Sequence, residues 1–320
     1  MRNPRLLETK DTLNIQSLKH LALRIGISKE EIIDITENIR KHYRFREETK
    51  IKNGRIKKRK IYRSTPRLKK VLKAINNSLL KKIKLSDAVH GSRKKHSPLT
   101  NAKKHVGQRY VLGFDIENFF PSIRTYSVFN MFRKLKCSPE VSKYLTRLCT
   151  ADNHIPQGYN TSPAIANLVS VPFTERLHGS AKKNGQNIGT FIDDICFSGN
   201  NSPEKYMKTI EKIINECGYR LKSEKTTLMK KNQQQKITGV VVNVKPNIDK
   251  KSFKDLKKMI HICEKFGPAA LIGKIKNKNG DPIDSSEKLR KHLLGRISHV
   301  NQLNAAKAEN LREKFNGIIW

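Results

Sequence analysis

Two apolar runs that carry acids constrain the fold more than any other feature of this sequence. The first, Tyr110–Ile116, is mostly apolar and has Asp115 near its end. The second, Thr190–Phe197, has the adjacent acids Asp193 and Asp194 in its middle. A short apolar run predicts a buried strand, and an acid pair inside such a run predicts a turn between two strands. We therefore expect strands that present carboxylates at their ends.

Helical patterns surround these strands. Segments 125–150 and 162–178 lie between the two runs and have helical character. From about residue 248 the pattern is helical again, and the apolar residues of one face are Phe253, Leu256, Met259, Ile260 and Cys263. Segment 286–316 is rich in Leu, Lys and Ala. Strands mixed with helices predict the α+β class, with a separate small helical unit at the C-terminal end.

The segment 15–40 predicts two short helices. They are broken at Gly26-Ile27-Ser28, and Ser28 is expected to cap the second helix. One interpretation is a helix-turn-helix DNA reader, and the other is a helical pair that packs on the main domain. The second is favoured because short helix pairs are common and no base-reading positions stand out.

The charge predicts a nucleic-acid partner. Lys and Arg number 66 against 28 Asp and Glu, which gives a formal net charge of +38. Such a surface binds phosphate backbones by counterion release. Membrane binding would need a spanning apolar run or a basic amphipathic helix with a continuous apolar face, and the sequence has neither. Met1–Asp11 is charged where a signal peptide is apolar, so we expect a cytoplasmic protein without a membrane partner.

Basic residues are concentrated between Lys50 and Lys84. This stretch has fifteen Lys or Arg residues and no acid, and apolar residues alternate around Asn53-Gly54 as in a hairpin. An ordinary solvated surface is the alternative, but such a surface rarely lacks acids over this length. We expect a basic flap that contacts phosphates.

The five cysteines form neither a C-x-x-C pair nor a zinc-like pattern with His. We expect small buried apolar residues and no disulfides.

The scarce acids predict metal chemistry. A carboxylate at a strand exit and an adjacent pair on a turn are what a phosphoryl-transfer enzyme uses to hold two Mg²⁺ ions about 3.5–4 Å apart, with Mn²⁺ as a possible substitute. One ion activates the attacking 3′ oxygen and the other holds the triphosphate. An Asp pair alone is more often a polar turn. The surrounding sequence decides between the two interpretations.

Three segments resemble the palm motifs of reverse transcriptases, in the family's order. They are Phe114-Asp115-Ile116-Glu117-Asn118-Phe119-Phe120-Pro121-Ser122-Ile123; Ile155-Pro156-Gln157-Gly158-Tyr159-Asn160-Thr161-Ser162-Pro163 with Ala166-Asn167-Leu168; and Phe191-Ile192-Asp193-Asp194. The resemblance extends to segments 59–62, 218–226 and 237–240, and covers roughly residues 15–315. It implies a right-hand polymerase with residues 1–48 as an N-terminal helical segment, 49–110 as fingers, 111–247 as palm with remaining fingers elements, and 248–320 as helical thumb.

Two further elements resemble the bacterial retron group of this family. Asn101-Ala102-x-x-His105 is similar to its Asn-Ala-x-x-His element, and Ile237-Thr238-Gly239 to its Val-Thr-Gly element. The resemblance implies an RNA-directed DNA polymerase that takes dNTPs and uses a cognate, structured non-coding RNA as primer and template. The product is single-stranded DNA, in many members joined to a 2′ hydroxyl of the RNA. It also implies anti-phage defence together with a separate effector protein.

The resemblance assigns the catalytic roles by motif position. Asp115, Asp193 and Asp194 would hold the metals, and Ile116 would lend its backbone carbonyl. Lys225 would approach the leaving pyrophosphate and donate a proton, with a plain surface Lys as an equal alternative.

The nucleotide site follows in the same way. Phe120 matches the steric gate that excludes a ribose 2′ hydroxyl, although a core Phe beside Phe119 is the alternative. Gln157 and Gly158 match residues that line the nucleotide and template. Two cations, Arg59 and Arg63, would meet the triphosphate.

Asn101 and His105 are predicted to bind RNA. His105 would stack on template RNA, but it would equally suit a buried position where it satisfies a backbone carbonyl.

Some positions depart from the family pattern. Phe191 stands where Tyr is usual and Ile192 where a smaller residue is usual, while Tyr159-Asn160-Thr161 replaces Ala-Pro-Ser. Two other functions stay open: a defence reverse transcriptase with protein-primed or untemplated synthesis, and a catalytically idle RNA-binding scaffold. A group II intron maturase is disfavoured by the length of the chain.

Overall fold

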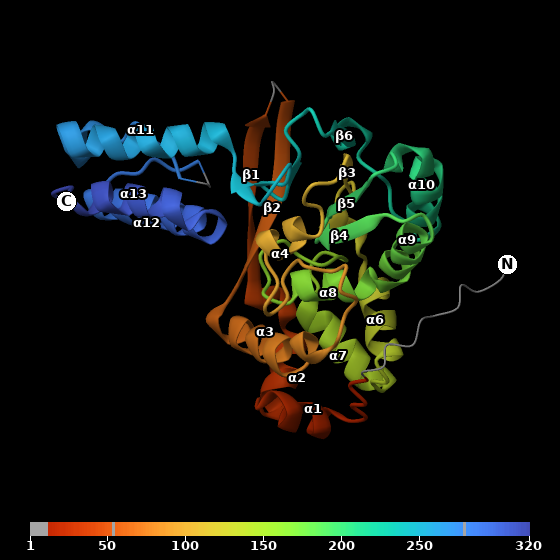
Figure 1. Ribbon diagram of the computed structural model, residues 1–320. Coiled ribbons are helices and arrows are strands. Elements are labelled where there is room, and N and C mark those ends of the chain that lie inside the picture. Colours follow the sequence, from red (N-terminus) through yellow and green to blue (C-terminus); the bar gives the residue numbers. More distant parts are fainter. Residues whose placement is uncertain (1–11, 53–54, 278–279) are drawn as a thin grey trace.

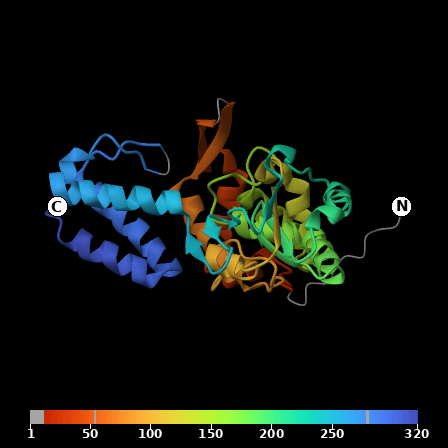
Figure 2. The same ribbon diagram turned by 45° about the horizontal axis from the view of Figure 1, so that its top comes forward.

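The computed structural model describes residues 12–52, 55–277 and 280–320. A body of sheets and helices carries a three-helix unit that extends from one side (Figure 1). The turned view separates the same two parts (Figure 2). The α+β class is confirmed, because antiparallel sheets and helices together form the body.

An antiparallel sheet lies at the centre of the body. Its strands, in sheet order, are β4 (Asn187–Phe191), β5 (Asp194–Gly199), β3 (Tyr110–Asp115) and β6 (Thr227–Lys230). The predicted strands are therefore confirmed, and a two-residue turn between β4 and β5 separates Phe191 from Asp194. The inner strands are apolar because both faces of the sheet are covered, as the buried pattern of β5 shows.

Helices pack around this sheet. They are α5 (Phe119–Ser122), α6 (Thr125–Lys134), α7 (Pro139–Cys149), α8 (Ser162–Val169), α9 (Val171–Lys183) and α10 (Met207–Glu216). Each of the two expected helices is in fact a pair. The first pair is divided where Lys136 adopts a left-handed φ of 63° and Ser138 caps the next helix.

The N-terminal helices are α1 (Leu18–Ile25) and α2 (Lys29–Glu37). Gly26 ends α1 with a left-handed φ of 67°, and the Ser28 hydroxyl accepts the Glu31 N–H at 3.2 Å, as predicted. Leu21 and Ile32 are fully buried in the large core of the body. This burial supports the packing interpretation of the pair. Residues 1–11, on which the expectation about a signal peptide depends, lie outside the described part of the chain.

The basic hairpin consists of β1 (Tyr43–Lys52) and β2 (Arg55–Ser64), which pair antiparallel along their full length. The predicted turn, Asn53-Gly54, lies outside the described residues. The expected fingers boundary after residue 48 falls inside β1, because pairing already begins at Tyr43. Helix α3 (Pro66–Ser78) continues from β2 and buries its apolar face in the body.

A small second sheet and a short helix connect the body to the C-terminal unit. The sheet has the order β7 (Lys236–Ile237), β8 (Val240–Val241) and β9 (Asn247–Ile248), and the helix is α4 (Pro98–Lys103).

The C-terminal unit contains α11 (Lys250–Phe266), α12 (Ser286–Leu303) and α13 (Ala305–Asn316). Its apolar residues form a core separate from that of the body, which confirms the predicted helical unit. Leu256, Ile260 and Cys263 are buried on the expected face of α11, and Phe253 and Met259 pack against this core.

The five cysteines are free, and four of them are buried, as predicted; Cys217 is only partly covered. None of the helices in the described ranges is long and apolar enough to cross a membrane.

Candidate active site

The acids of the two apolar runs come together at one end of the central sheet. Asp115, the last residue of β3, is the register partner of Asp194, the first residue of β5. Directly opposite residues project from the same face, with Cβ atoms about 4.5–5.5 Å apart. The Ile116 N–H donates to the Asp193 carbonyl at 3.1 Å, which ties the turn to the end of β3.

The turn that carries the acids is held in an uncommon conformation. Ile192 has a φ of 62°, which a β-branched residue rarely adopts. Segment 88–91 holds the end of β4, just before the turn. The Thr190 N–H donates to the Ala88 carbonyl at 2.7 Å, and the His90 N–H donates to the Thr190 carbonyl at 2.8 Å. A side chain at Gly91 would meet the Ile192 nitrogen at 2.7 Å. The surrounding structure therefore determines where the acids lie.

The carboxylates lie in a partly desolvated environment. Asp115 is 7% exposed, and the Lys225 ammonium contacts its carboxylate. Burial, with the charge of Asp193 as the second cause, raises the pKa of the Asp194 carboxyl to about 6. Lys225 is exposed and compensates charge at Asp115, while its role in proton transfer stays a prediction.

This donor set suits a hard divalent cation. Carboxylate oxygens are the ligands that Mg²⁺ prefers, and the ammonium at Asp115 marks a point where the site favours positive charge. Within the described ranges, no three His, Cys, Asp or Glu side chains are already grouped as a metal cage. The site thus offers acids placed on two neighbouring strands and a turn, with Asp193 and Asp194 adjacent in the chain.

Phe120 lies close to these acids in the chain and is only partly buried, whereas Phe119 is 3% exposed. Their rings meet edge to face with centroids 6.1 Å apart. Phe119 is the core residue of the two, which leaves Phe120 available for a role at the surface of the site.

Gln157 and Gly158 lie against the basic hairpin. The Tyr62 N–H of β2 donates to the Gln157 carbonyl at 2.7 Å. Gly158 has a φ of 119°, and a Cβ there would come within 2.2 Å of the Tyr62 carbonyl oxygen. Only glycine fits this approach. Arg59 and Arg63 are exposed and lie on the other face of β2 from Tyr62, because side chains alternate along a strand.

Asn101 and His105 are both fully buried. His105 Nδ1 is 2.7 Å from the Ser198 hydroxyl of β5, and a Cβ at Gly189 of β4 would meet the Asn101 side-chain oxygen at 1.9 Å. Burial, followed by the nearby charges of His90 and Lys104, lowers the pKa of His105 to about 3, so the ring is neutral. Direct RNA contact by either residue is a wrong expectation for this conformation, because neither side chain reaches solvent. The buried position of His105 agrees with the second interpretation, but its partner is the Ser198 hydroxyl and not the backbone carbonyl that was expected.

The two elements with retron-like sequences adjoin each other. Ala102 of α4 shares a small core with Ile237 and Val240, which lie on either side of Thr238-Gly239. The Thr238 hydroxyl donates to the Pro98 carbonyl at 3.4 Å. Together they form a junction between the catalytic sheet and the start of the C-terminal unit.

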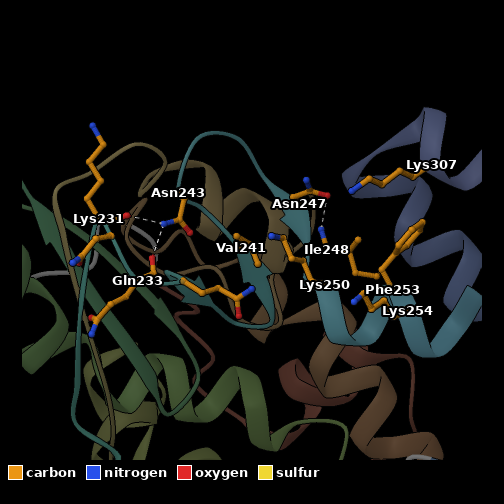
Figure 3. A pocket seen from close by; sticks show the side chains of 12 residues that line it. Lys231, Gln233, Val241, Asn243, Asn247, Ile248, Lys250, Phe253, Lys254 and Lys307 are labelled. Carbon is orange, nitrogen blue, oxygen red and sulfur yellow. Dashed lines mark hydrogen bonds between the residues drawn. The ribbon is translucent and has the colours of Figure 1, made fainter.

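A basic hollow of about 500 Å³ lies beyond this junction, between the β7–β9 sheet and the C-terminal helices. Four lysines line it: Lys231, Lys250, Lys254 and Lys307 (Figure 3). Phe253 also faces the hollow, and Lys307 lies 5.1 Å from the centre of its ring. None of its described lining residues is acidic.

Sequence reasoning missed this hollow and also missed Asp152, which contacts the basic hairpin. The lysines could not be singled out among 66 cations. Asp152 did carry a signal, because acids are scarce and it lies five residues before Gln157.

Comparison with known proteins identifies the family. Residues 51–242 match the family described as "Reverse transcriptase (RNA-dependent DNA polymerase)". The chain belongs to this family. It is 29% identical over 299 residues to the Retron Ec86 reverse transcriptase of Escherichia coli, covering 89% of this chain and 91% of that protein. It is 30% identical over 264 residues to the Retron Se72 reverse transcriptase of Salmonella heidelberg, covering 79% and 69%.

These relatives confirm the predicted retron type, and the reverse transcriptase is an RNA-directed DNA polymerase. Among solved structures, telomerase from Candida albicans has a TM-score of 0.43 at 9% identity, over 84% of this chain and 56% of the telomerase chain. Truncated apo telomerase from Candida tropicalis has a TM-score of 0.41 at 10% identity, over 67% and 58%. The reverse transcriptase thus spans little more than half of each telomerase chain.

Proposed function

We propose that this reverse transcriptase copies one cognate, structured non-coding RNA into single-stranded DNA. The observation that carries the proposal is the placement of Asp115 opposite Asp194, with Asp193 on the adjoining turn. An idle RNA-binding scaffold has no use for such acids, because they repel the phosphate backbone that it binds. The same placement favours an active polymerase over the scaffold.

Asp115, Asp193 and Asp194 would hold two Mg²⁺ ions, with the Ile116 carbonyl as a further ligand and Mn²⁺ as a possible substitute. When bound, the ions supply activation of the primer 3′ oxygen and neutralisation of the triphosphate. Lys225, which contacts Asp115, would donate a proton to the leaving pyrophosphate.

The nucleotide site is proposed to lie between the basic hairpin and the acids. Arg59 and Arg63 would bind the triphosphate, and Gln157 with Gly158 would seat the base and its template partner. Phe120 would exclude the ribose 2′ hydroxyl, which its partial exposure beside a buried Phe119 allows. The fingers, palm and thumb would then divide as 49–110, 111–247 and 248–320, with the first residues of β1 added to the fingers.

The basic hollow is the proposed contact for the folded RNA. Its lysines suit phosphates, and Phe253 suits stacking by an unpaired base. A stem read by its A-form shape would supply selectivity that charge alone does not.

The experiment is recovery of the nucleic acid that copurifies with the protein from its native host. We expect one RNA species, encoded beside the gene, that leaves a discrete single-stranded DNA with a short 5′ RNA remnant after ribonuclease treatment. Heterogeneous cellular RNA without attached DNA would contradict the retron function. DNA attached to the protein would instead select protein priming.

We extend the proposal to anti-phage defence in the cytoplasm, acting with a separate effector protein. The family resemblance alone supports this step. Plating efficiency of phages on cells with and without the gene and its neighbours tests it, and equal plating for a broad panel of phages would contradict it.

A further inference from the structure

Three segments of the chain meet on the carboxylate of Asp152. The Tyr62 hydroxyl donates to one of its oxygens at 2.8 Å, and the Tyr43 hydroxyl donates to the other at 3.1 Å. The Arg40 guanidinium also contacts that second oxygen, at 2.9 Å. Tyr43 begins β1 and Tyr62 lies near the end of β2, so both bonds hold the base of the basic hairpin.

The loop that carries Asp152 is built to aim its side chain at the hairpin. Asp152 and the next residue, Asn153, have left-handed φ values of 47° and 65°. Ala151 and His154 exchange backbone hydrogen bonds of 3.0 and 3.1 Å around them, which closes a tight turn. Asp and Asn tolerate this conformation better than other side chains. The Asn153 carbonyl also accepts the Thr125 N–H at 3.2 Å, which fixes the loop to α6.

The same loop continues into the Gln157–Gly158 pair. There the hairpin is held a second time, because the Tyr62 N–H donates to the Gln157 carbonyl at 2.7 Å. Tyr62 thus contacts the loop through its backbone at one point and through its hydroxyl at another. Two contacts on one residue fix an angle between the hairpin and the loop, whereas one contact would leave a hinge.

The charges suit a permanent carboxylate at the centre of this cluster. Burial acts to raise the pKa of the Asp152 carboxyl, but the hydrogen bonds from Tyr62 and Tyr43 and the charge of Arg40 outweigh it and keep the pKa below the usual value. Burial, with the Asp152 bond as the second cause, raises the pKa of Tyr62, so its hydroxyl remains a donor. The His154 ring packs edge-on against Tyr62 at a centroid distance of 5.7 Å.

We propose that Asp152 is a positioning residue of the polymerase. Its carboxylate sets the β1–β2 hairpin against the loop that carries Gln157 and Gly158, and so fixes the two sides of the nucleotide site relative to each other. This inference rests on the proposed nucleotide contacts of Arg59 and Gln157.

The test is steady-state incorporation of one dNTP on a supplied primer–template by Asp152→Asn, Tyr62→Phe and the double variant. Loss of a charge-assisted hydrogen bond is expected to raise the KM for dNTP about tenfold, with kcat within about twofold of the parent. The double variant should raise KM by less than the product of the two single effects, because both changes weaken the same hydrogen bond between Tyr62 and Asp152. Asp284→Asn, which breaks an exposed ion pair with Lys288, is the matched control and should leave KM unchanged.

An unchanged KM in a folded Asp152→Asn protein overturns the inference, as does a loss of kcat that follows the fall in thermal midpoint. If Asp152→Asn does not fold, Tyr62→Phe decides alone, because it keeps the buried ring and loses only the hydroxyl. Arg59→Ala separates the two proposals: an unchanged KM there contradicts the nucleotide contact itself, whatever Asp152 does.

Discussion

The body and the C-terminal helical unit differ in where buried polar residues and strained backbone conformations occur. Among the described residues, every polar residue that is buried as a whole and every non-glycine residue with positive φ lies in the body, at or before residue 238. The core of residues 248–320 is apolar throughout the described part. A unit of this kind gives a regular scaffold for cations, whereas the body accepts strain to place particular groups. Chemistry and RNA retention should therefore be separable by mutation.

The largest expected effect comes from the acids of the body. Asp193→Ala with Asp194→Ala should lower DNA synthesis by about 10³-fold or more, because the ligands of the chemical step are lost. The Asp284→Ala, Glu287→Ala pair at the start of α12 removes the same charge from an exposed site and serves as control. Primer extension measures both, and activity retained by the Asp193/Asp194 variant would contradict the metal assignment.

The hollow is the corresponding site at the edge of the helical unit, which contributes three of its four lysines. Changing Lys231, Lys250, Lys254 and Lys307 to Gln should weaken binding of the copurified RNA about 10- to 100-fold and flatten its salt dependence. Synthesis on an unrelated primer–template should be unaffected. A control with Lys182, Lys183, Lys205 and Lys208 changed removes equal charge near α9 and α10, on the other side of the body (Figure 1). Equal losses of RNA affinity in both variants would mean that the lysines of the hollow contribute only general positive charge and no specific RNA contact.

The two neighbouring phenylalanines of α5 test whether a residue of the nucleotide site can be told from a residue of the hydrophobic core. Phe120→Val should lower the preference for dNTP over rNTP by about 10- to 100-fold, since a pocket wall is removed. Phe119→Ala should instead cost about 3–5 kcal/mol of unfolding free energy, because that ring is buried. Competitive incorporation and chemical denaturation measure the two effects, and unchanged nucleotide preference in Phe120→Val would exclude it as the gate.

The strands, the acid turn and the helical unit were predictable, because local patterns determine them. The run ending at Asp115 is apolar because both faces of its strand are covered, and this apolar pattern is the local signal that predicted the strand. Asn101 and His105 were predicted as RNA contacts, with a buried position as an equal alternative for His105, and the structure buries both. Their burial depends on Gly189, which is distant in sequence and leaves the space that they fill.

The sequence could predict which residues belong to the candidate site, but not how they are arranged in space. Motif order named Gln157 and Gly158, yet nothing local revealed that Tyr62 approaches both. The hydrogen bonds around Asp152 and the four-lysine hollow depend on contacts between segments far apart in the chain. A short stretch of sequence cannot show such contacts.

The smallest predicted effect concerns acid sensitivity of the body. Because burial lowers the pKa of His105 to about 3, the unfolded chain binds a proton first, and stability present above about pH 6.5 is lost as the pH falls toward 3. The share of this loss that belongs to His105 should be about 1 kcal/mol per pH unit, and His105→Gln should remove that share. The buried His90, whose pKa burial lowers to about 4, keeps a loss of its own in the variant. The exposed His261→Gln is the control. Thermal unfolding between pH 7.5 and 5.5 measures it, and identical pH profiles for His105→Gln and the parent would contradict it.

The central claim is that the acids of the body carry out DNA synthesis while other residues select the RNA. Its most direct test is to sequence the nucleic acid that copurifies with the Asp193→Ala, Asp194→Ala protein from its native host. We predict the same single RNA species that the parent protein carries, at similar occupancy, with no DNA attached. DNA still joined to that RNA, or a mixture of unrelated cellular RNAs in its place, would contradict the separation.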